Sequence, residues 1–292
     1  MKRILTALFL SALLLSCGNK TAQHDPDADK TIVIGTTQKP TYPDMINAVI
    51  KPELEKKGYT VKLIELDDQK VFNETLINGD VDVNIGQHGS ALDFEKANNP
   101  GWHISALTSV PSAHIGLFSD KYPVKTIDEL KSKLQKGDII AIPDDVSNGA
   151  RALIFLENLG IIKLRTDKDK FSVSEKDIAE NPYGVEVKAI KAEQIPRILD
   201  GIAAGVIYGD DADLLGILDR AIIREVNEDD QYFIIFVAQD ANLEKQWAKD
   251  LVEVVHSETF KNTIENTEYR FHKYNRPSWY REKWGIALEW GK

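Results

Sequence analysis

The residue types best suited to binding chemistry stand together in residues 144–149 (DDVSNG) and Arg151. The apolar run before them, 139–143, ends at a proline, which cannot donate to a sheet ladder and so marks the end of a β-strand. Helical spacing resumes at 152–156, so the loop is predicted to lead into a helix N-terminus, whose unpaired backbone N–H groups can bind an anion. Ser147, Asn148 and Gly149 are expected to shape this loop.

Arg151 is expected in the first turn of the helix. Its planar guanidinium can hold a carboxylate through two hydrogen bonds, and this predicts a carboxylate-binding site. An equally simple interpretation is that Arg151 pairs with a neighbouring aspartate at the surface, a contact that contributes little to stability.

Pairs of acidic residues follow other predicted strands as well. Such acids often cap helices. If they face a ligand instead, they favour one that carries an ammonium group. The pairs are Asp67-Asp68, Asp144-Asp145 and Asp210-Asp211.

The elements that must position these residues follow a repeated strand–helix pattern. Short apolar or alternating runs predict strands, and apolar residues at helical spacing separate them, which favours largely parallel sheets covered by helices. The predicted strands are 31–36, 60–66, 81–85, 104–110, 115–119, 139–142, 185–190, 204–208 and 232–238, and helices are predicted at 45–57, 71–78 and 243–260.

This pattern predicts an α/β protein of two lobes, with mostly parallel sheets and a ligand cleft at the carboxyl ends of the strands. Residues 115–119 and 232–238 are expected to carry the chain between the lobes. The first lobe would comprise residues 31–113 and 236–292, and the second residues 114–235. Such lobes bind by hinge closure around the ligand.

Composition narrows the classes of function. The 292 residues include 36 Lys and Arg against 46 Asp and Glu, a net charge of −10, which argues against nucleic-acid binding. No Gly-x-Ser-x-Gly elbow, P-loop or Gly-x-Gly-x-x-Gly appears, so no catalytic residues and no cofactor are predicted. The six histidines are scattered, so no metal site is predicted either.

The N-terminus has the features of an export signal. Lys2 and Arg3 precede a short apolar segment, 4–15, and the single cysteine, Cys17, follows it directly. This order resembles the bacterial lipobox, which implies a signal peptide at 1–16, diacylation of Cys17 and a lipid-anchored, extracytoplasmic place in the cell envelope. An ordinary secretory signal with a chance cysteine is the alternative. Polar residues 17–30 are expected to form a flexible tether.

Segments over most of the chain resemble the NlpA/MetQ family, the lipoprotein substrate-binding components of methionine-type ABC importers. The resemblance implies that Arg151 holds the ligand's α-carboxylate, that His88 lines the pocket, and that ABC membrane subunits are the partners. Without it, His88 reads as an ordinary loop histidine. The matching segments are 49–59 (VIKPELEKKGY), 78–84 (NGDVDVN), Gln87-His88, 115–122 (IGLFSDKY), 141–153 (AIPDDVSNGARAL), 160–164 (GIIKL), 177–182 (DIAENP) and 193–200 (EQIPRILD).

The chain departs from the family pattern in the side-chain pocket. Gln69 and Gly86 stand where the family has aromatic residues that sandwich methionine, and Tyr208 and Phe233 stand where it has asparagines. Losing the rings removes apolar contact and predicts a larger, more polar cavity.

His88 and Gln87 are expected to line one wall of this pocket, and Tyr208 and Asp210 the other. Methionine is the ligand implied by the family. Another amino acid, a short peptide or a cationic amino-acid-like solute remains open, as does a surface lipoprotein without a transport role. The tryptophans of the C-terminal tail, Trp279, Trp284 and Trp290, are expected to dock on the first lobe.

Overall fold

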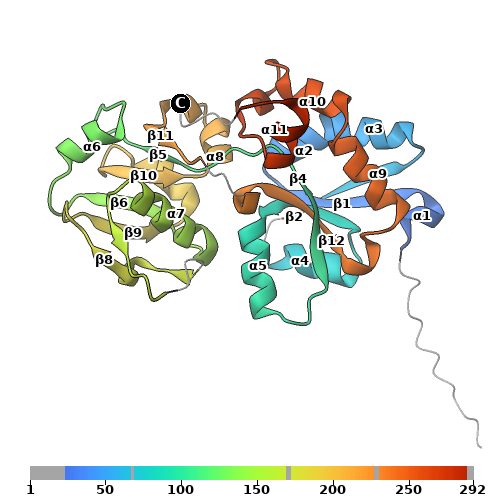
Figure 1. Cartoon of the computed structure of the whole chain (residues 1–292), viewed down its shortest axis with the longest axis horizontal. Helices are drawn as coiled ribbons and strands as arrows, with labels where there is room; N and C mark the ends of the chain where they lie inside the picture. Colours follow the sequence, from blue (N-terminus) through green and yellow to red (C-terminus); the bar gives the residue numbers. More distant parts are fainter. Residues whose placement is uncertain (1–23, 67–68, 169–171, 227–229, 288–292) are drawn as a thin grey trace, which may run out of the picture.

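The computed structural model describes residues 24–66, 69–168, 172–226 and 230–287, and these form two lobes (Figure 1). The first lobe is built on a five-stranded sheet in the order β2-β1-β3-β12-β4. Its strands are β1 (Thr31–Thr37), β2 (Thr60–Leu66), β3 (Val83–His88), β4 (Ile104–Ser109) and β12 (Ile234–Gln239).

The second lobe repeats this plan with the order β11-β5-β10-β6-β9. Its strands are β5 (Gly116–Phe118), β6 (Ile139–Pro143), β9 (Glu186–Ile190), β10 (Ala204–Ile207) and β11 (Ile223–Arg224), and a separate pair joins β7 (Lys163–Leu164) to β8 (Ile178–Glu180). The two-lobed α/β fold predicted from the sequence is confirmed.

The two five-stranded sheets are mostly parallel, as predicted, and each contains one reversed strand. In the first sheet β12 runs antiparallel to both β3 and β4, and in the second β5 runs antiparallel to both β10 and β11. Both reversed strands are the first strands that the chain forms after crossing into a lobe. Each enters its sheet from the other lobe without a crossover helix, which only a parallel connection within one sheet requires.

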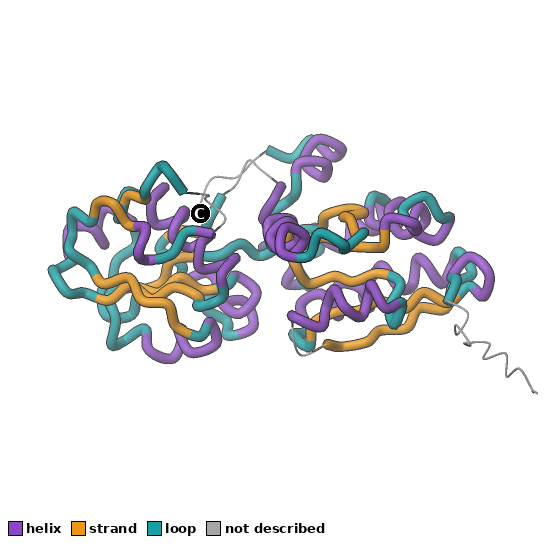
Figure 2. The backbone as a smooth tube through the Cα atoms, turned by 90° about the horizontal axis from the view of Figure 1, so that it is seen from below, coloured by secondary structure: helices purple, strands orange, loops and turns teal. Residues whose placement is uncertain are grey.

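Helices cover both sheets (Figure 2). In the first lobe they are α1 (Pro26–Asp29), α2 (Thr41–Met45), η1 (Ile46–Ile50), α3 (Lys51–Lys56), α4 (Gln69–Asn78), α5 (Gly89–Asn98), η7 (Asp240–Asn242), α9 (Gln246–Val255), α10 (Glu258–Glu265), η8 (Arg270–Lys273) and α11 (Ser278–Trp284). In the second lobe and the return crossing they are α6 (Ile127–Lys133), α7 (Val146–Asn158), η3 (Glu175–Asp177), η4 (Ala192–Ile198), α8 (Gly209–Leu214), η5 (Leu218–Arg220) and η6 (Asp230–Tyr232).

Each sheet buries an apolar core on either face, as the strand period of two requires. In β6, Ile140 and Ile142 pack with α7 on one face, while Ala141 packs with Ile195 of η4 on the other. Gly205 on the neighbouring strand allows this close packing, because a Cβ there would lie 2.5 Å from Cγ2 of Ile195. The central strand that leads to the site is therefore held from both sides.

The chain crosses between the lobes twice, once between β4 and β5 and once between β11 and β12. The two crossings are tied together, since Glu225 N donates to Ile115 O at 2.8 Å and Ile234 N donates to Ser112 Oγ at 2.9 Å. The lobe boundaries predicted at 113–114 and 235–236 stay predictions.

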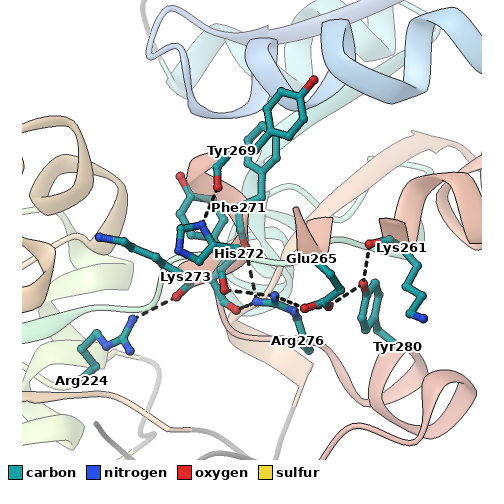
Figure 3. A network of polar contacts seen from close by, with 10 residues as sticks. Arg224, Lys261, Glu265, Tyr269, Phe271, His272, Lys273, Arg276 and Tyr280 are labelled. Atoms are coloured by element: carbon teal, nitrogen blue, oxygen red, sulfur yellow. Dashed lines mark hydrogen bonds and ion pairs between the residues drawn. The ribbon is translucent and has the colours of Figure 1, made fainter. Parts of the chain in front are cut away.

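A C-terminal segment links the lobes on a second side. Arg224 of β11 donates to the carbonyl of Lys273 in η8 at 3.0 Å (Figure 3). The Lys273 ammonium lies 2.6 Å from Asp219 of the second lobe. Arg276, a few residues on, pairs with Glu265 of α10 at 3.0 Å. This segment is thus fastened to both lobes.

Residues 24–30 belong to the first lobe, which corrects the expectation that the tether extends to residue 30. The Asp27 carboxylate accepts hydrogen bonds from Gln246 N at 3.1 Å and Trp247 N at 2.9 Å, and Lys245 pairs with Asp25 at 2.9 Å. These acids satisfy the unpaired N–H groups at the start of α9, a partner that local sequence does not reveal.

The C-terminal tail also packs on the first lobe, which confirms the prediction for Trp279 and Trp284. Tyr280 is fully buried in the core, and the ring of Trp279 stacks on His256 at 3.6 Å. Trp290 and Cys17 lie outside the described residues. Within the described residues, no helix is long and apolar enough to cross a membrane.

Candidate functional site

The N-terminus of α7 lies at the centre of the predicted site, but its geometry differs from the expectation. The helix begins at Val146, so Ser147, Asn148 and Gly149 are helical rather than part of a loop. The Asp145 carboxylate accepts a hydrogen bond from Asn148 N at 2.9 Å. This cap supplies a carboxylate of the chain itself to one N–H group of the helix N-terminus, and ligand binding there stays a prediction.

Arg151 is the sixth residue of α7, in the second turn rather than the first. Its guanidinium pairs with the Glu225 carboxylate: Nε donates at 2.9 Å to one oxygen and at 3.2 Å to the other, and an Nη2 contact completes the pair. Both residues are 5% exposed, and the guanidinium also lies 4.5 Å from the ring centre of Tyr232. Arg151 therefore has an ionic partner, but this partner is a buried glutamate far away in the sequence rather than a neighbouring surface aspartate.

His88 ends β3 and bridges the two lobes. Its Nδ1 accepts from Ala91 N at 3.1 Å, so the ring proton is on Nε2, which donates to Asn148 Oδ1 of the second lobe at 3.1 Å. Burial, helped by the positive charge of Arg151, lowers the pKa of His88 to about 3. His88 is therefore neutral at physiological pH and caps α5, rather than lying in a loop.

Tyr208 and Asp210 lie at the start of α8, opposite β1 of the first lobe. The Tyr208 hydroxyl donates to the second oxygen of Asp145, which joins the loops after β10 and β6. Burial raises the pKa of Asp210, and the ammonium of Lys39 lies 3.9 Å from its carboxylate. Lys39 also pairs with Asp211 at 2.6 Å, so this acidic pair contacts the opposite lobe as well as standing in the first turn of its helix.

Gln87 forms a reciprocal amide pair with Asn73, in which its Nε2 donates at 2.6 Å and its Oε1 accepts at 3.1 Å. Asn84 extends this network by donating to Asn73 at 3.2 Å. The three amides satisfy one another within the first lobe. We call them the neutral wall, and their contact with a ligand stays a prediction.

Gly86 does not open extra space in the direction of a side chain. A Cβ there would lie 2.6 Å from Cγ2 of Thr37 and 2.9 Å from Cζ of Phe72, so these two side chains fill the position. The expected larger cavity is not present at this point. Gln69 begins α4, but its side chain, like Asp67 and Asp68, lies outside the described residues.

Sequence reasoning missed Glu225 and Tyr232, the two closest partners of Arg151. Glu225 is a single acid after a two-residue strand, a weak signal beside the paired aspartates. Tyr232 looked like the start of the apolar strand that follows it. Phe233 is buried, with its ring 4.6 Å from that of His114 on the other crossing.

Together these residues can recognise a small polar ligand between the lobes. They offer one buried guanidinium, one buried carboxylate, a neutral imidazole donor and a wall of amides. Among the described residues, no group of three or more His, Cys, Asp or Glu side chains is placed to hold a metal ion.

The chain matches the family model described as NlpA lipoprotein over residues 32–279. It is 31% identical to outer membrane lipoprotein 3 of Mannheimia haemolytica, across 89% of this chain and 92% of that protein. It is 30% identical to the methionine-binding lipoprotein MetQ of Bacillus subtilis, across 88% and 94%.

Solved structures with a similar fold are also similar to this chain in sequence. A nutrient-binding protein from Burkholderia cenocepacia, bound to methionine, superposes with a TM-score of 0.70 at 30% identity. The match covers 80% of this chain and 95% of that one. The family match, over residues 32–279, therefore spans both lobes.

Proposed function

The chain belongs to the NlpA lipoprotein family, and we propose that its two lobes capture methionine or a close amino-acid relative for delivery to an ABC importer. The fold, the shared length with methionine-binding relatives and the polar site between the lobes support this function. The protein is proposed to act by binding alone, without catalysis.

The observation that carries the proposal is the buried guanidinium of Arg151 beside the lobe-bridging contact of His88 with Asn148. A buried guanidinium is costly unless anionic groups pair with it, and it suits bidentate recognition of a carboxylate. Because His88 and Arg151 lie at a contact between lobes, closure would bury a ligand there.

Anchoring is proposed to act through Cys17, upstream of the described residues. Residues 24–30 are fastened to α9 of the first lobe. A lipid at Cys17 would therefore hold the first lobe near the membrane and leave the second lobe to open and close.

The test is native mass spectrometry of the chain lacking residues 1–17, followed by calorimetric titration with methionine and the other common amino acids. We expect a co-purified amino acid, and binding that Arg151→Met weakens by at least about 100-fold, because a charge-assisted bidentate contact is lost. Arg165→Met is the matched control, since Arg165 pairs with Asp167 at the exposed surface.

A different amino acid in the mass spectrum would keep the architecture and change the specificity. If no amino acid binds and Arg151→Met alters nothing, the receptor function is wrong. A surface lipoprotein without a transport role would then account better for the chain.

A further inference from the structure

The guanidinium that is proposed to hold the ligand's carboxylate already holds one from the protein itself. Nε of Arg151 lies within 3.2 Å of both oxygens of Glu225, and each residue is 5% exposed. A ligand carboxylate that simply displaced Glu225 would leave a buried, unpaired charge, which is strongly unfavourable.

Glu225 is also held in place by its backbone. Its N–H donates to Ile115 O at 2.8 Å, and its carbonyl oxygen lies 3.2 Å from Nδ1 of His114. Both contacts come from the other crossing, so the residue is fixed where the two crossings run side by side. The backbone of Glu225 is therefore fixed beside Arg151.

The charges of Arg151 and Glu225 sum to zero, and the buried imidazole rings of His88 and His114 add no charge at neutral pH. Burial lowers the pKa of His88 to about 3 and that of His114 to about 4. A bare carboxylate would leave this region with one excess negative charge, and a bare amine with one positive charge. A zwitterion leaves it neutral.

We propose that Glu225 is a specificity-determining residue that receives the ligand's α-ammonium while Arg151 receives its α-carboxylate. The inference rests on the proposed function and defines its ligand as a zwitterionic α-amino acid. A zwitterion between the two side chains exchanges one ion pair for two and leaves no charge unpaired.

The residues first expected to line this wall do not offer a better acceptor for the ammonium. The hydroxyl of Tyr208 is engaged with Asp145, and the Asp210 carboxylate faces the Lys39 ammonium of the first lobe at 3.9 Å. Phe233 has no polar group and packs against His114. Glu225 is the carboxylate in direct contact with Arg151.

The test compares calorimetric affinities for L-methionine and for 4-(methylsulfanyl)butanoate, which lacks only the amino group. The protein lacking residues 1–17 is expected to prefer methionine by about 100-fold, and Glu225→Gln to reduce this preference to less than about 10-fold, because one charge-assisted contact is lost. The ratio is decisive because freeing Arg151 changes both affinities alike. Glu244→Gln, at an exposed glutamate of the first lobe, is the matched control.

Glu225→Asp keeps the charge and is expected to keep a preference for methionine. An unchanged preference in a folded Glu225→Gln protein overturns the inference, while loss of methionine binding in Arg151→Met still supports the proposed function. Should Glu225→Gln fail to fold, equal affinity of the unaltered protein for the two ligands overturns it. Failure of every amino acid to bind overturns both proposals.

Discussion

The two lobes bring different chemistry to their shared site. The first lobe contributes neutral groups: the Gln87, Asn73 and Asn84 amides and the uncharged ring of His88. The second lobe and the return crossing contribute charged groups, with Arg151 paired to Glu225.

The difference indicates a division of labour. The three amides are satisfied within their own lobe and are therefore fixed in shape, whereas the charged pair can exchange partners with a ligand. We infer that the second lobe sets the charge of the ligand and the first lobe restricts its shape. Substitutions in the charged pair should then have larger effects than substitutions in the neutral wall.

The largest effect is expected from removing one member of the charged pair. Arg151→Met leaves Glu225 buried and unpaired and should lower the free energy of unfolding by about 3–5 kcal/mol. The double variant Arg151→Met, Glu225→Leu should recover most of this loss. Urea denaturation measures the free energy of unfolding of the unaltered protein, of Arg151→Met, of Glu225→Leu and of the double variant. Additive losses would show that the two side chains are not coupled.

His88, the titratable residue among these neutral groups, should instead make the free energy of unfolding depend on pH. The pKa of His88 is about 3 in the folded protein, against about 6.5 in an unfolded chain, so the unfolded state binds more protons between these values. The free energy of unfolding therefore falls as the pH drops below about 6.5. His88→Gln should reduce this slope by about 1.4 kcal/mol per pH unit near pH 5.

Urea denaturation between pH 5 and pH 7 measures the slope. Glutamine keeps an N–H donor for Asn148, so the variant tests titration rather than the hydrogen bond. His103→Gln, at an exposed histidine, is the matched control. Equal slopes in all three proteins would contradict the neutrality of His88.

A smaller loss is expected from filling Gly86. Its Cβ position is occupied by Thr37 and Phe72, so Gly86→Ala should lower the free energy of unfolding by about 1–3 kcal/mol through overpacking. Gly101→Ala is the matched control, because nothing lies within 4 Å of that Cβ. A neutral or stabilising Gly86→Ala would show that the wall is less rigid than the contacts indicate.

The smallest effect is expected at the half-exposed contact between the lobes. Lys39→Met removes the ion pair between Lys39 and Asp211. The Lys39 side chain is 41% exposed, so the loss should change ligand affinity by less than about 5-fold. The change should shrink at high salt. Lys249→Met, which removes an ion pair within the first lobe, should leave affinity unchanged. A larger, salt-independent change at Lys39 would give this contact a direct role in binding.

Local patterns in the sequence were enough to predict much of the fold. The alternating run 60–66 coincides with β2, and β6 ends at the proline that was expected to end it. The N-terminal elements were harder: α2 begins at Thr41, before the predicted helix start at residue 45. Pro43 lies in the first turn of this helix, where a proline is tolerated because the N–H it lacks would be unpaired anyway. Polar residues 24–30 gave no sign of the distant helix that holds them.

The sequence by itself determined the strand and helix periods, the helix that carries Arg151, and the charge and type of each side chain, because these depend on neighbours along the chain. Only the tertiary structure decided which side chains meet. Glu225 contacts Arg151 from 74 positions away, and His88 contacts Asn148 from 60 positions away. Such contacts arise where separate elements pack, and no local period or spacing encodes them.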